Sequence, residues 1–254
     1  MMRLSIIIPT HNEAANIGDL VTYLREKGGA HVQEVIVVDG GSDDGTMDLA
    51  AKAGAQVVYS AQRCRAVQLN LGASRARGEL FYFVHADTVP PPSFAEDALQ
   101  AVREGFVYGN YASAFVGKAQ MGVNGRMTQR DWLVTRGGGD QTLFITKEFY
   151  EELGGFNPRF VLMEDFDLVR RARRRARMCI LQERVYVSTR KYLRNSYFRV
   201  SLANLIVYVS FLLRVHPRGL AWMYRKLLRP IPKVAGQPSM VQQVQQGQHL
   251  PTHA

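Results

Sequence analysis

Four apolar runs in the first hundred residues, each followed by a polar loop, restrict most strongly the folds that this chain can adopt. The runs lie at residues 3–8, 35–38, 57–59 and 80–84, and segments with apolar residues at helical spacing follow them. The runs at 35–38 and 80–84 carry no charge, as is typical of strands buried on both faces of a parallel sheet. Strands that alternate with helices in this way predict a doubly wound α/β fold.

The repeating pattern weakens after residue 105. Residues 106–115 predict a strand or a hairpin, and residues 120–136 have no clear period, so this region is our candidate for the acceptor side. Further on, strands and helices are expected at 142–146, 147–153, 164–176, 179–181 and 185–187. The α/β domain is therefore predicted to span residues 1–194.

The rest of the chain divides into an apolar segment and a polar tail. Residues 200–215 are strongly apolar but contain polar side chains, and they fall short of the roughly 20 residues needed to cross a bilayer. We therefore assign residues 195–229 to a C-terminal helical segment in which this apolar stretch forms a helix that packs on the domain. The alternative is a helix that lies in a membrane interface, flanked by arginines. Residues 230–254 are rich in Gln, Pro, Gly and His, which predicts a disordered tail.

The net charge of +10 is compatible with phosphorylated ligands, nucleic acid or an anionic membrane, so its distribution matters. Basic residues are concentrated late, and an arginine run at 170–177 is more often a solvated face than a nucleic-acid surface. Cys64 and Cys179 have no zinc or disulfide spacing. The chain begins without a basic, then apolar, signal segment, so we expect a cytoplasmic protein, peripheral on the inner face of the membrane if 195–229 is interfacial.

The loops that follow the predicted strands are unusually polar. They read Pro-Thr-His-Asn-Glu at 9–13, Asp-Gly-Gly-Ser-Asp-Asp-Gly-Thr at 39–46 and His-Ala-Asp at 85–87. Each loop alone is better explained by turns and helix caps, which use the same residue types. In an open α/β sheet, however, ligands bind beyond the carboxyl ends of the strands. Several carboxylates on one such rim are costly unless a cation or a polar ligand neutralises them.

These motifs together resemble the GT-A fold, family 2 glycosyltransferases. The resemblance begins with the segments at 6–13 and 37–46, and it continues in the same order with Ala86-Asp87, Gly154-Gly155-Phe156 and Glu164-Asp165. It covers about residues 3–190. His-Ala-Asp-Thr at 85–88 and Gly-Asp-Gln at 139–141 are similar to a small bacterial subgroup. The resemblance implies a mixed GT-A sheet with C-terminal helices and a transferase, of hexosyl type, that uses a nucleotide-diphosphate sugar.

Several residues are candidates for binding the donor nucleotide. A carboxylate at Asp39, at the end of a buried strand, can accept a hydrogen bond from the imide of uracil or the amino edge of guanine, and the resemblance implies that role; a turn cap is the alternative. Glu13, which would line the base and ribose, could equally be a surface acid in a first helical turn. The full candidate set in these two loops is Pro9, Thr10, Asn12, Glu13, Asp39, Gly41 and Ser42.

Asp87 is the candidate metal ligand. Mg²⁺ or Mn²⁺ takes few protein carboxylates and completes its octahedron with phosphate oxygens and water. The family has an acid two residues earlier, where this chain has His85. An imidazole suits Mn²⁺ better than Mg²⁺, and His85 is kept as a second candidate ligand that could instead only hydrogen-bond or stack.

The resemblance implies that Asp165 of the Glu164-Asp165 pair is the general base, at a helix N-terminus where the dipole favours an ionised carboxylate. Helix capping is the competing explanation. Arg65 could pair with the diphosphate or be a solvated charge. Asp140 and Gln141, after three glycines, offer contacts to the sugar or acceptor, or form a flexible turn.

The expected reaction is an inverting displacement in which a sugar moves from a UDP- or GDP-linked donor to a hydroxyl of an unknown acceptor. Two alternatives remain. A sugar-nucleotide pyrophosphorylase-like enzyme would have a Gly-rich, basic loop after the first strand, and residues 9–13 do not provide it. A non-catalytic protein would instead bind nucleic acid or an anionic membrane through the basic second half of the chain. Of these two partners, we do not expect nucleic acid.

Overall fold

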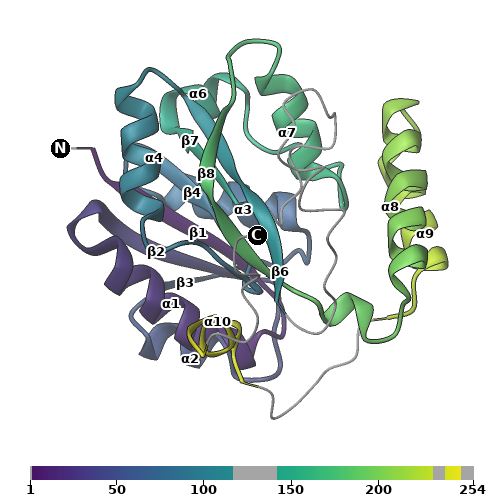
Figure 1. The fold of residues 1–254 in the computed structure, drawn as a ribbon, viewed down its shortest axis with the longest axis horizontal. Coiled ribbons are helices and arrows are strands. Elements are labelled where there is room, and N and C mark those ends of the chain that lie inside the picture. The colour runs from purple at the N-terminus through teal and green to yellow at the C-terminus, as the bar shows by residue number, and fades with distance from the viewer. Residues whose placement is uncertain (1, 117–141, 231–237, 247–254) are drawn as a thin grey trace, which may run out of the picture.

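The fold is a layered α/β structure around one mixed sheet. It was obtained as a computed structural model and describes residues 2–116, 142–230 and 238–246. Within these ranges the sheet has eight strands in the order β3-β2-β1-β4-β7-β6-β8-β5 (Figure 1). The strands are β1 (Leu4–Thr10), β2 (Val32–Asp39), β3 (Gln56–Tyr59), β4 (Leu80–Phe83), β5 (Thr88–Val89), β6 (Tyr108–Val116), β7 (Leu143–Thr146) and β8 (Cys179–Ser188).

The first four strands of the chain form a parallel half-sheet. β2 and β4 flank β1, and β3 pairs with β2, all in parallel register. β7 then pairs antiparallel with both β4 and β6, and β8 runs parallel to β6 and antiparallel to β5. The sequence prediction of a doubly wound mixed sheet is therefore confirmed.

Alternating side chains divide the core into two layers. In β1, Leu4, Ile6 and Ile8 point into one cluster, whereas Ile7 points into the other. The first cluster is covered by α1 (Ala14–Gly28), α2 (Thr46–Lys52), α4 (Phe94–Arg103) and α10 (Met240–Gln245), and the second by α3 (Arg65–Arg75), α6 (Lys147–Glu152) and α7 (Glu164–Ala172). This period of two places apolar residues on both faces of the sheet, as the uncharged runs predicted.

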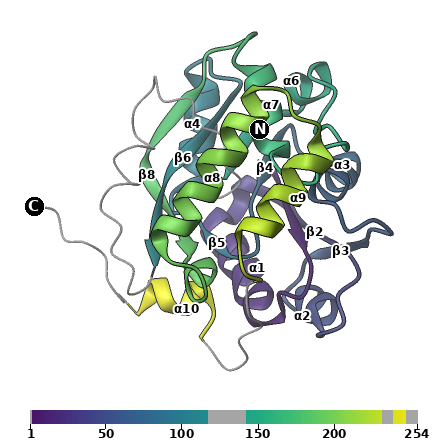
Figure 2. The ribbon, with the colours of Figure 1, turned by 90° about the vertical axis from the view of Figure 1, so that its right-hand side faces the viewer.

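Two further helices form a hairpin on one side of the molecule. α8 (Tyr197–Leu212) follows a short 3-10 helix, η3 (Arg190–Tyr192), and packs along α9 (Pro217–Leu227). Figures 1 and 2 show α8 and α9 side by side. Val207, Phe211 and Leu220 of this hairpin form a third apolar cluster with Met163, directly before α7. Among the described residues there is no helix with both the length and the apolar character to cross a membrane.

One local expectation was wrong. β8 is one strand rather than two, because a register shift between its pairs with Tyr111 and Ala112 accommodates the polar residues in its middle. At the start of α2, the side chain of Asp44 accepts a hydrogen bond from Thr46 N at 3.1 Å. The division of the chain into domains stays a prediction.

The tail prediction was also wrong for residues 240–245. They form α10, whose Ser239 caps the helix and donates a hydrogen bond to Asp19 of α1. Met240 and Val241 are buried against the first core cluster, and Asn16 accepts a hydrogen bond from Met240 N. Two apolar residues in an otherwise polar stretch are enough to position α10, because they pack against the core cluster next to α1.

A buried carboxylate links β1, β2 and the start of β4. Glu34 accepts hydrogen bonds from Ser5 Oγ, from Arg77 N at 3.0 Å and from Arg77 Nε, and Ser5 Oγ in turn accepts one from Gly78 N at 2.8 Å. Burial alone would raise the pKa of Glu34, but the hydrogen bonds from Ser5 and Arg77 outweigh it and hold the pKa below 4.5. The ionised carboxylate therefore stabilises the fold at neutral pH.

We predict that Glu34→Gln lowers the free energy of unfolding by about 1–3 kcal/mol at neutral pH, because the substitution removes charge-assisted hydrogen bonds. Since the folded pKa is depressed, this contribution is present above the unfolded pKa and is lost as the pH falls through the folded one. Denaturant titrations should thus show the difference shrinking towards about pH 3. Exposed Glu26→Gln is the matched control; an equal loss at both pH values contradicts the prediction.

Candidate active site

The carboxyl end of β2 is organised around Asp39, whose side chain is fully buried. Its Oδ1 accepts hydrogen bonds from Gly41 N at 2.9 Å and Ser42 N at 2.7 Å, and its Oδ2 accepts them from Ser42 Oγ and, at 3.0 Å, from Thr10 Oγ1. Gly41 has a φ of 85°, which a glycine adopts without strain. Four donors fill the acceptor sites of one carboxylate, so Asp39 fixes the shape of this loop.

The loop after β1 is bound to the loop after β2. Asn12 N donates to Ser42 Oγ at 2.8 Å, and Asn12 Oδ1 accepts from Asp43 N at 3.0 Å. Glu13 N donates to Thr46 Oγ1 at 2.9 Å, which joins the start of α1 to the start of α2. Pro9 and Thr10 are buried at the end of β1. The structure thus brings together all seven predicted residues of these loops, with the side chains of Asn12, Glu13 and Ser42 partly exposed.

Arg190 joins two of the predicted acids. Its Nη2 lies 2.8 and 3.0 Å from the two carboxylate oxygens of Glu13 and 3.3 Å from Oδ2 of Asp87. Burial raises the pKa of Glu13 and Arg190 opposes that shift. The side chains are 28% exposed for Arg190, 18% for Glu13 and 35% for Asp87, so the triad lies at the rim, where a ligand could reach Asp87.

Sequence reasoning missed Arg190. β8 pairs with β5, which begins directly after Asp87, and Ser188 N donates to Asp87 O at 3.2 Å. The residues that follow β8 are thereby brought to the loop that follows β4. The sequence does show a basic residue, Arg190, soon after the last predicted strand. Its position next to Asp87, however, depends on the pairing of β8 with β5, which the sequence pattern does not reveal.

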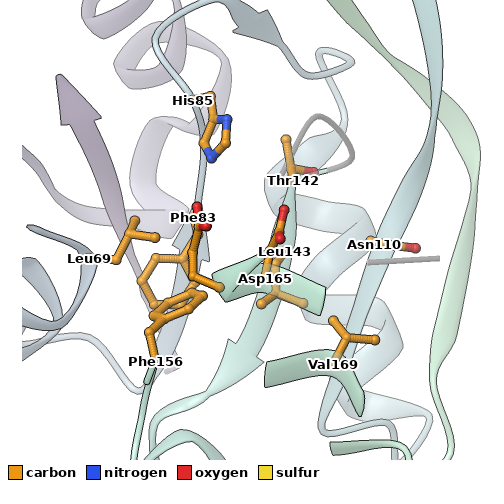
Figure 3. Close-up of a pocket in the computed structure, with 10 residues that line it drawn as sticks. Leu69, Phe83, His85, Asn110, Thr142, Leu143, Phe156, Asp165 and Val169 are labelled. Carbon is orange, nitrogen blue, oxygen red and sulfur yellow. The ribbon is translucent and has the colours of Figure 1, made fainter. Parts of the chain in front are cut away.

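A small cavity of about 20 Å³ lies beyond the end of β4, and both apolar and polar side chains line it. His85, Glu164 and Asp165 line it, as do Asn110 and Thr142, which sequence reasoning did not include in the site. Figure 3 shows Leu69, Phe83 and Phe156 grouped on one side of this space, away from Thr142 and Asn110. Asp165 Oδ1 also accepts a hydrogen bond from Phe166 N at 2.8 Å, in the first turn of α7.

Glu164 is buried, with its side chain 1% exposed, and its main neighbour is Arg65 at the start of α3. Arg65 Nε lies 3.1 Å from Glu164 Oε1, yet within the described part of the chain neither oxygen of Glu164 has a hydrogen-bond partner. Glu164 raises the pKa of Arg65, and Asp165 and Asp87 add to that effect. A buried carboxylate that faces a cavity without a hydrogen bond is costly, so this cavity favours a ligand that donates one.

A divalent cation fits the rim only as part of a larger complex. In residues 2–116, 142–230 and 238–246 no three His, Cys, Asp or Glu side chains converge as a metal site would require. Asp87 offers a partly exposed hard oxygen, but His85 lines the cavity with Asp165 and Asp87 does not. The residues therefore fit a cation held by Asp87, whose other ligands come from phosphate oxygens and water. Asp140 and Gln141 lie outside the described residues.

A family model described as "Glycosyl transferase family 2" matches residues 5–172. This chain belongs to the family 2 glycosyltransferases. Among its relatives, Glycosyltransferase AglJ of Haloferax volcanii is 51% identical over 53 residues, which is 21% of this chain and 16% of that protein. An uncharacterized glycosyltransferase of Haemophilus influenzae is 23% identical over 177 residues, 65% of this chain and 60% of that one. The chain thus spans less than two thirds of the length of either relative.

Solved structures of glycosyltransferases share the fold. Mannosyltransferase PcManGT from Pyrobaculum calidifontis, in complex with GDP-Man and Mn²⁺, has a TM-score of 0.66 at 20% identity and covers 88% of this chain and 68% of its own. S. aureus TarS 1-349 with UDP has a TM-score of 0.63 at 18% identity (89% and 70%). Glucosyl-3-phosphoglycerate synthase from Mycobacterium tuberculosis, with Mn²⁺ and UDP, has a TM-score of 0.56 at 20% identity (74% and 70%).

We predict that Arg190→Gln lowers the free energy of unfolding by about 1–3 kcal/mol, because it leaves the partly buried Glu13 and its neighbour Asp87 without their shared cation. Denaturant unfolding in metal-free buffer measures the loss. Arg194→Gln, an exposed arginine four residues on, is the control and should change stability little. Equal effects of the two substitutions would show that the triad contributes nothing.

Proposed function

We propose that this chain transfers a hexose from a UDP- or GDP-linked donor to an acceptor hydroxyl, with inversion at the anomeric carbon. The observation that supports it most directly is the convergence of Glu164, Asp165 and His85 on one cavity, beyond the strand whose loop carries Asp87. Membership of the family agrees with this arrangement. A place in the His-Ala-Asp-Thr subgroup is part of the same proposal.

In the proposed donor site, the nucleotide lies against the loops after β1 and β2. Asp39 holds the loop of Gly41 and Ser42 in shape through its four hydrogen bonds, and reading the base is its additional proposed role. Because Asp39 is buried and its acceptor sites are occupied, contact with a base requires an existing donor, such as the hydroxyl of Ser42, to turn away. Pro9, Thr10, Asn12 and Glu13 complete this wall.

Asp165 is the proposed general base, which removes the proton from the attacking hydroxyl. One of its oxygens is fixed by Phe166 N, which orients the carboxylate at the edge of the cavity. Glu164, buried beside it without a hydrogen bond from the described residues, would accept one from a sugar or acceptor hydroxyl. Arg65 is held by Glu164, and its charge would partly offset that of an approaching diphosphate.

Asp87, with His85 as a second candidate, is the proposed ligand for Mg²⁺ or Mn²⁺. A divalent cation there would act as a Lewis acid on the leaving diphosphate. Arg190, which contacts Asp87, would add a second positive charge on the same side. Asp140 and Gln141 stay candidates for contacts to the sugar or acceptor. A cytoplasmic location with peripheral contact to the inner face of the membrane remains a prediction, as does the absence of a nucleic-acid partner.

We predict that Asp165→Asn lowers the rate of sugar transfer by about a hundredfold to ten-thousandfold, because the amide cannot accept the proton. Binding of the donor should persist, since the asparagine side chain keeps the size of the aspartate and one acceptor oxygen. Release of UDP or GDP from a panel of nucleotide sugars measures the rate, and exposed Asp48→Asn on α2 is the control. Full transfer activity in the Asp165 variant would exclude this residue as the base.

We further predict that UDP or GDP raises the melting temperature of the chain, and more so with Mn²⁺ present, because a ligand that binds only the folded state stabilises it. Asp87→Asn should abolish the additional rise in melting temperature that Mn²⁺ causes, and it should keep the rise that the nucleotide alone causes. No stabilisation by either diphosphate, together with salt-sensitive binding of DNA, would favour the non-catalytic alternative instead.

A further inference from the structure

One face of α8 carries an exposed apolar stripe. Its members are separated by alternate steps of four and three residues, so they line one side of the helix. They are Phe198, Leu202, Leu205, Val209 and Leu212, and the exposed fraction of Phe198 reaches 75%. The opposite side of α8, with Val200, Ala203, Val207 and Phe211, is buried on the hairpin and the body of the domain. Packing therefore explains only one of the two apolar faces.

The hairpin ends add to this surface. Leu213 and Val215 are exposed in the turn after α8, and Trp222 on α9 is 59% exposed. Figure 2 shows α8 and α9 in front of the molecule, on the side away from the sheet. Exposed apolar residues gathered on one face of a helix and at its end mark an interaction site in a folded protein.

The charge around the stripe has one sign. All 22 acidic residues of the chain lie within its first 183 positions, whereas 11 of its 32 basic residues lie in the last 71. The part of the chain before residue 184 is therefore nearly neutral, and the excess positive charge belongs to the part that contains the hairpin. Exposed basic side chains on and beside the hairpin are Arg199, Arg214, Arg218, Arg225, Lys226 and Arg229.

From this combination we infer that the outer face of the α8–α9 hairpin docks on an anionic lipid bilayer, with the stripe in the interface and the basic residues at the headgroups. An apolar helical face with cationic flanks is the arrangement that binds such surfaces. α8 has 16 residues, fewer than the roughly 20 that span a bilayer, so the helix lies along the surface. A second copy of the chain is a poorer partner, because two acid-free, cationic hairpins repel each other.

Docking on this face would bring the bilayer close to the proposed base. The inner side of the hairpin touches the first turn of α7: the ring centroid of Phe166 lies 5.8 Å from that of Tyr208 and 6.5 Å from that of Phe211. Phe166 follows Asp165 directly. Arg170, one turn further on, lies with its Cζ 4.6 Å from the centroid of the Phe211 ring. In the docked state, the hairpin would lie between the lipid surface and the turn of α7 that carries Asp165.

The test is flotation of the full chain with lipid vesicles, and it does not depend on the proposed sugar transfer. Vesicles with about a third of their lipid as phosphatidylglycerol should carry the chain upward, whereas pure phosphatidylcholine vesicles should bind at least roughly tenfold less. Binding to the anionic vesicles should weaken as salt rises. A chain that stays unbound with anionic vesicles at low salt would overturn the inference.

Matched variants separate the stripe from a general effect. Leu205→Gln with Val209→Gln should reduce binding to anionic vesicles by roughly tenfold, because the apolar face loses its centre. Leu49→Gln, an exposed leucine on α2, should bind as the unsubstituted chain does. Arg214→Gln with Arg218→Gln should weaken the salt-sensitive component of binding to anionic vesicles. Lys52→Gln with Arg75→Gln, which removes two positive charges away from the hairpin, should leave that component unchanged.

Three controls make the outcome decisive. Thermal unfolding must show that the stripe variant is folded, as expected for exposed positions. Sedimentation of the free chain must show no dimer that the stripe variant abolishes, since such a dimer would assign this face to a second copy and contradict the inference. Stabilisation by UDP or GDP, measured without vesicles, reports on the proposed function separately, so either proposal can fail while the other holds.

Discussion

The rest of the site depends on one buried carboxylate, that of Asp39. A fully buried carboxylate at the end of a strand must be satisfied by donors, and here they come from two chain segments: Thr10 of β1 and the backbone and hydroxyl of the loop after β2. Gln68 of α3 reinforces the same junction, since its Nε2 donates to Thr10 O at 2.9 Å and Val38 O at 2.8 Å. The two loops of the proposed nucleotide site are therefore fixed by interactions that exist without a ligand.

Arg190 supplies the second constraint, because it connects the first loop of the fold with the loop after β4. It contacts Glu13, 177 positions earlier, and Asp87, 103 positions earlier. Two carboxylates that lie close together at one rim repel each other unless a cation lies between them, and Arg190 provides that cation. Its contact with Asp87 is longer than those with Glu13, which leaves Asp87 the more accessible of the two acids.

The elements that the sequence predicted best are those whose pattern is local. The uncharged run at 35–38 predicted β2, because a strand buried on both faces of a sheet needs apolar residues at successive positions. Glu164 and Asp165 were placed at a helix start because apolar residues at helical spacing follow them. Arg190 and α10 were missed because their positions depend on partners far away, Asp87 for one and Asn16 of α1 for the other. The buried pairing of Arg65 with Glu164 was missed likewise, since each lies at a helix start that gives no hint of the other.

The hairpin of α8 and α9 bears on the proposed role of Asp165, although the family match ends at residue 172. α7 lies between two apolar surfaces: Leu168, Val169 and Ala172 pack on the sheet side, whereas Phe166 packs against the hairpin. Met163, which precedes α7 with a φ of 71°, is buried in that same hairpin cluster. The strained turn that aims Glu164 and Asp165 at the cavity is thus held by side chains of α8 and α9. A bilayer docked on the hairpin, as inferred above, would therefore also act on the segment that positions the proposed base.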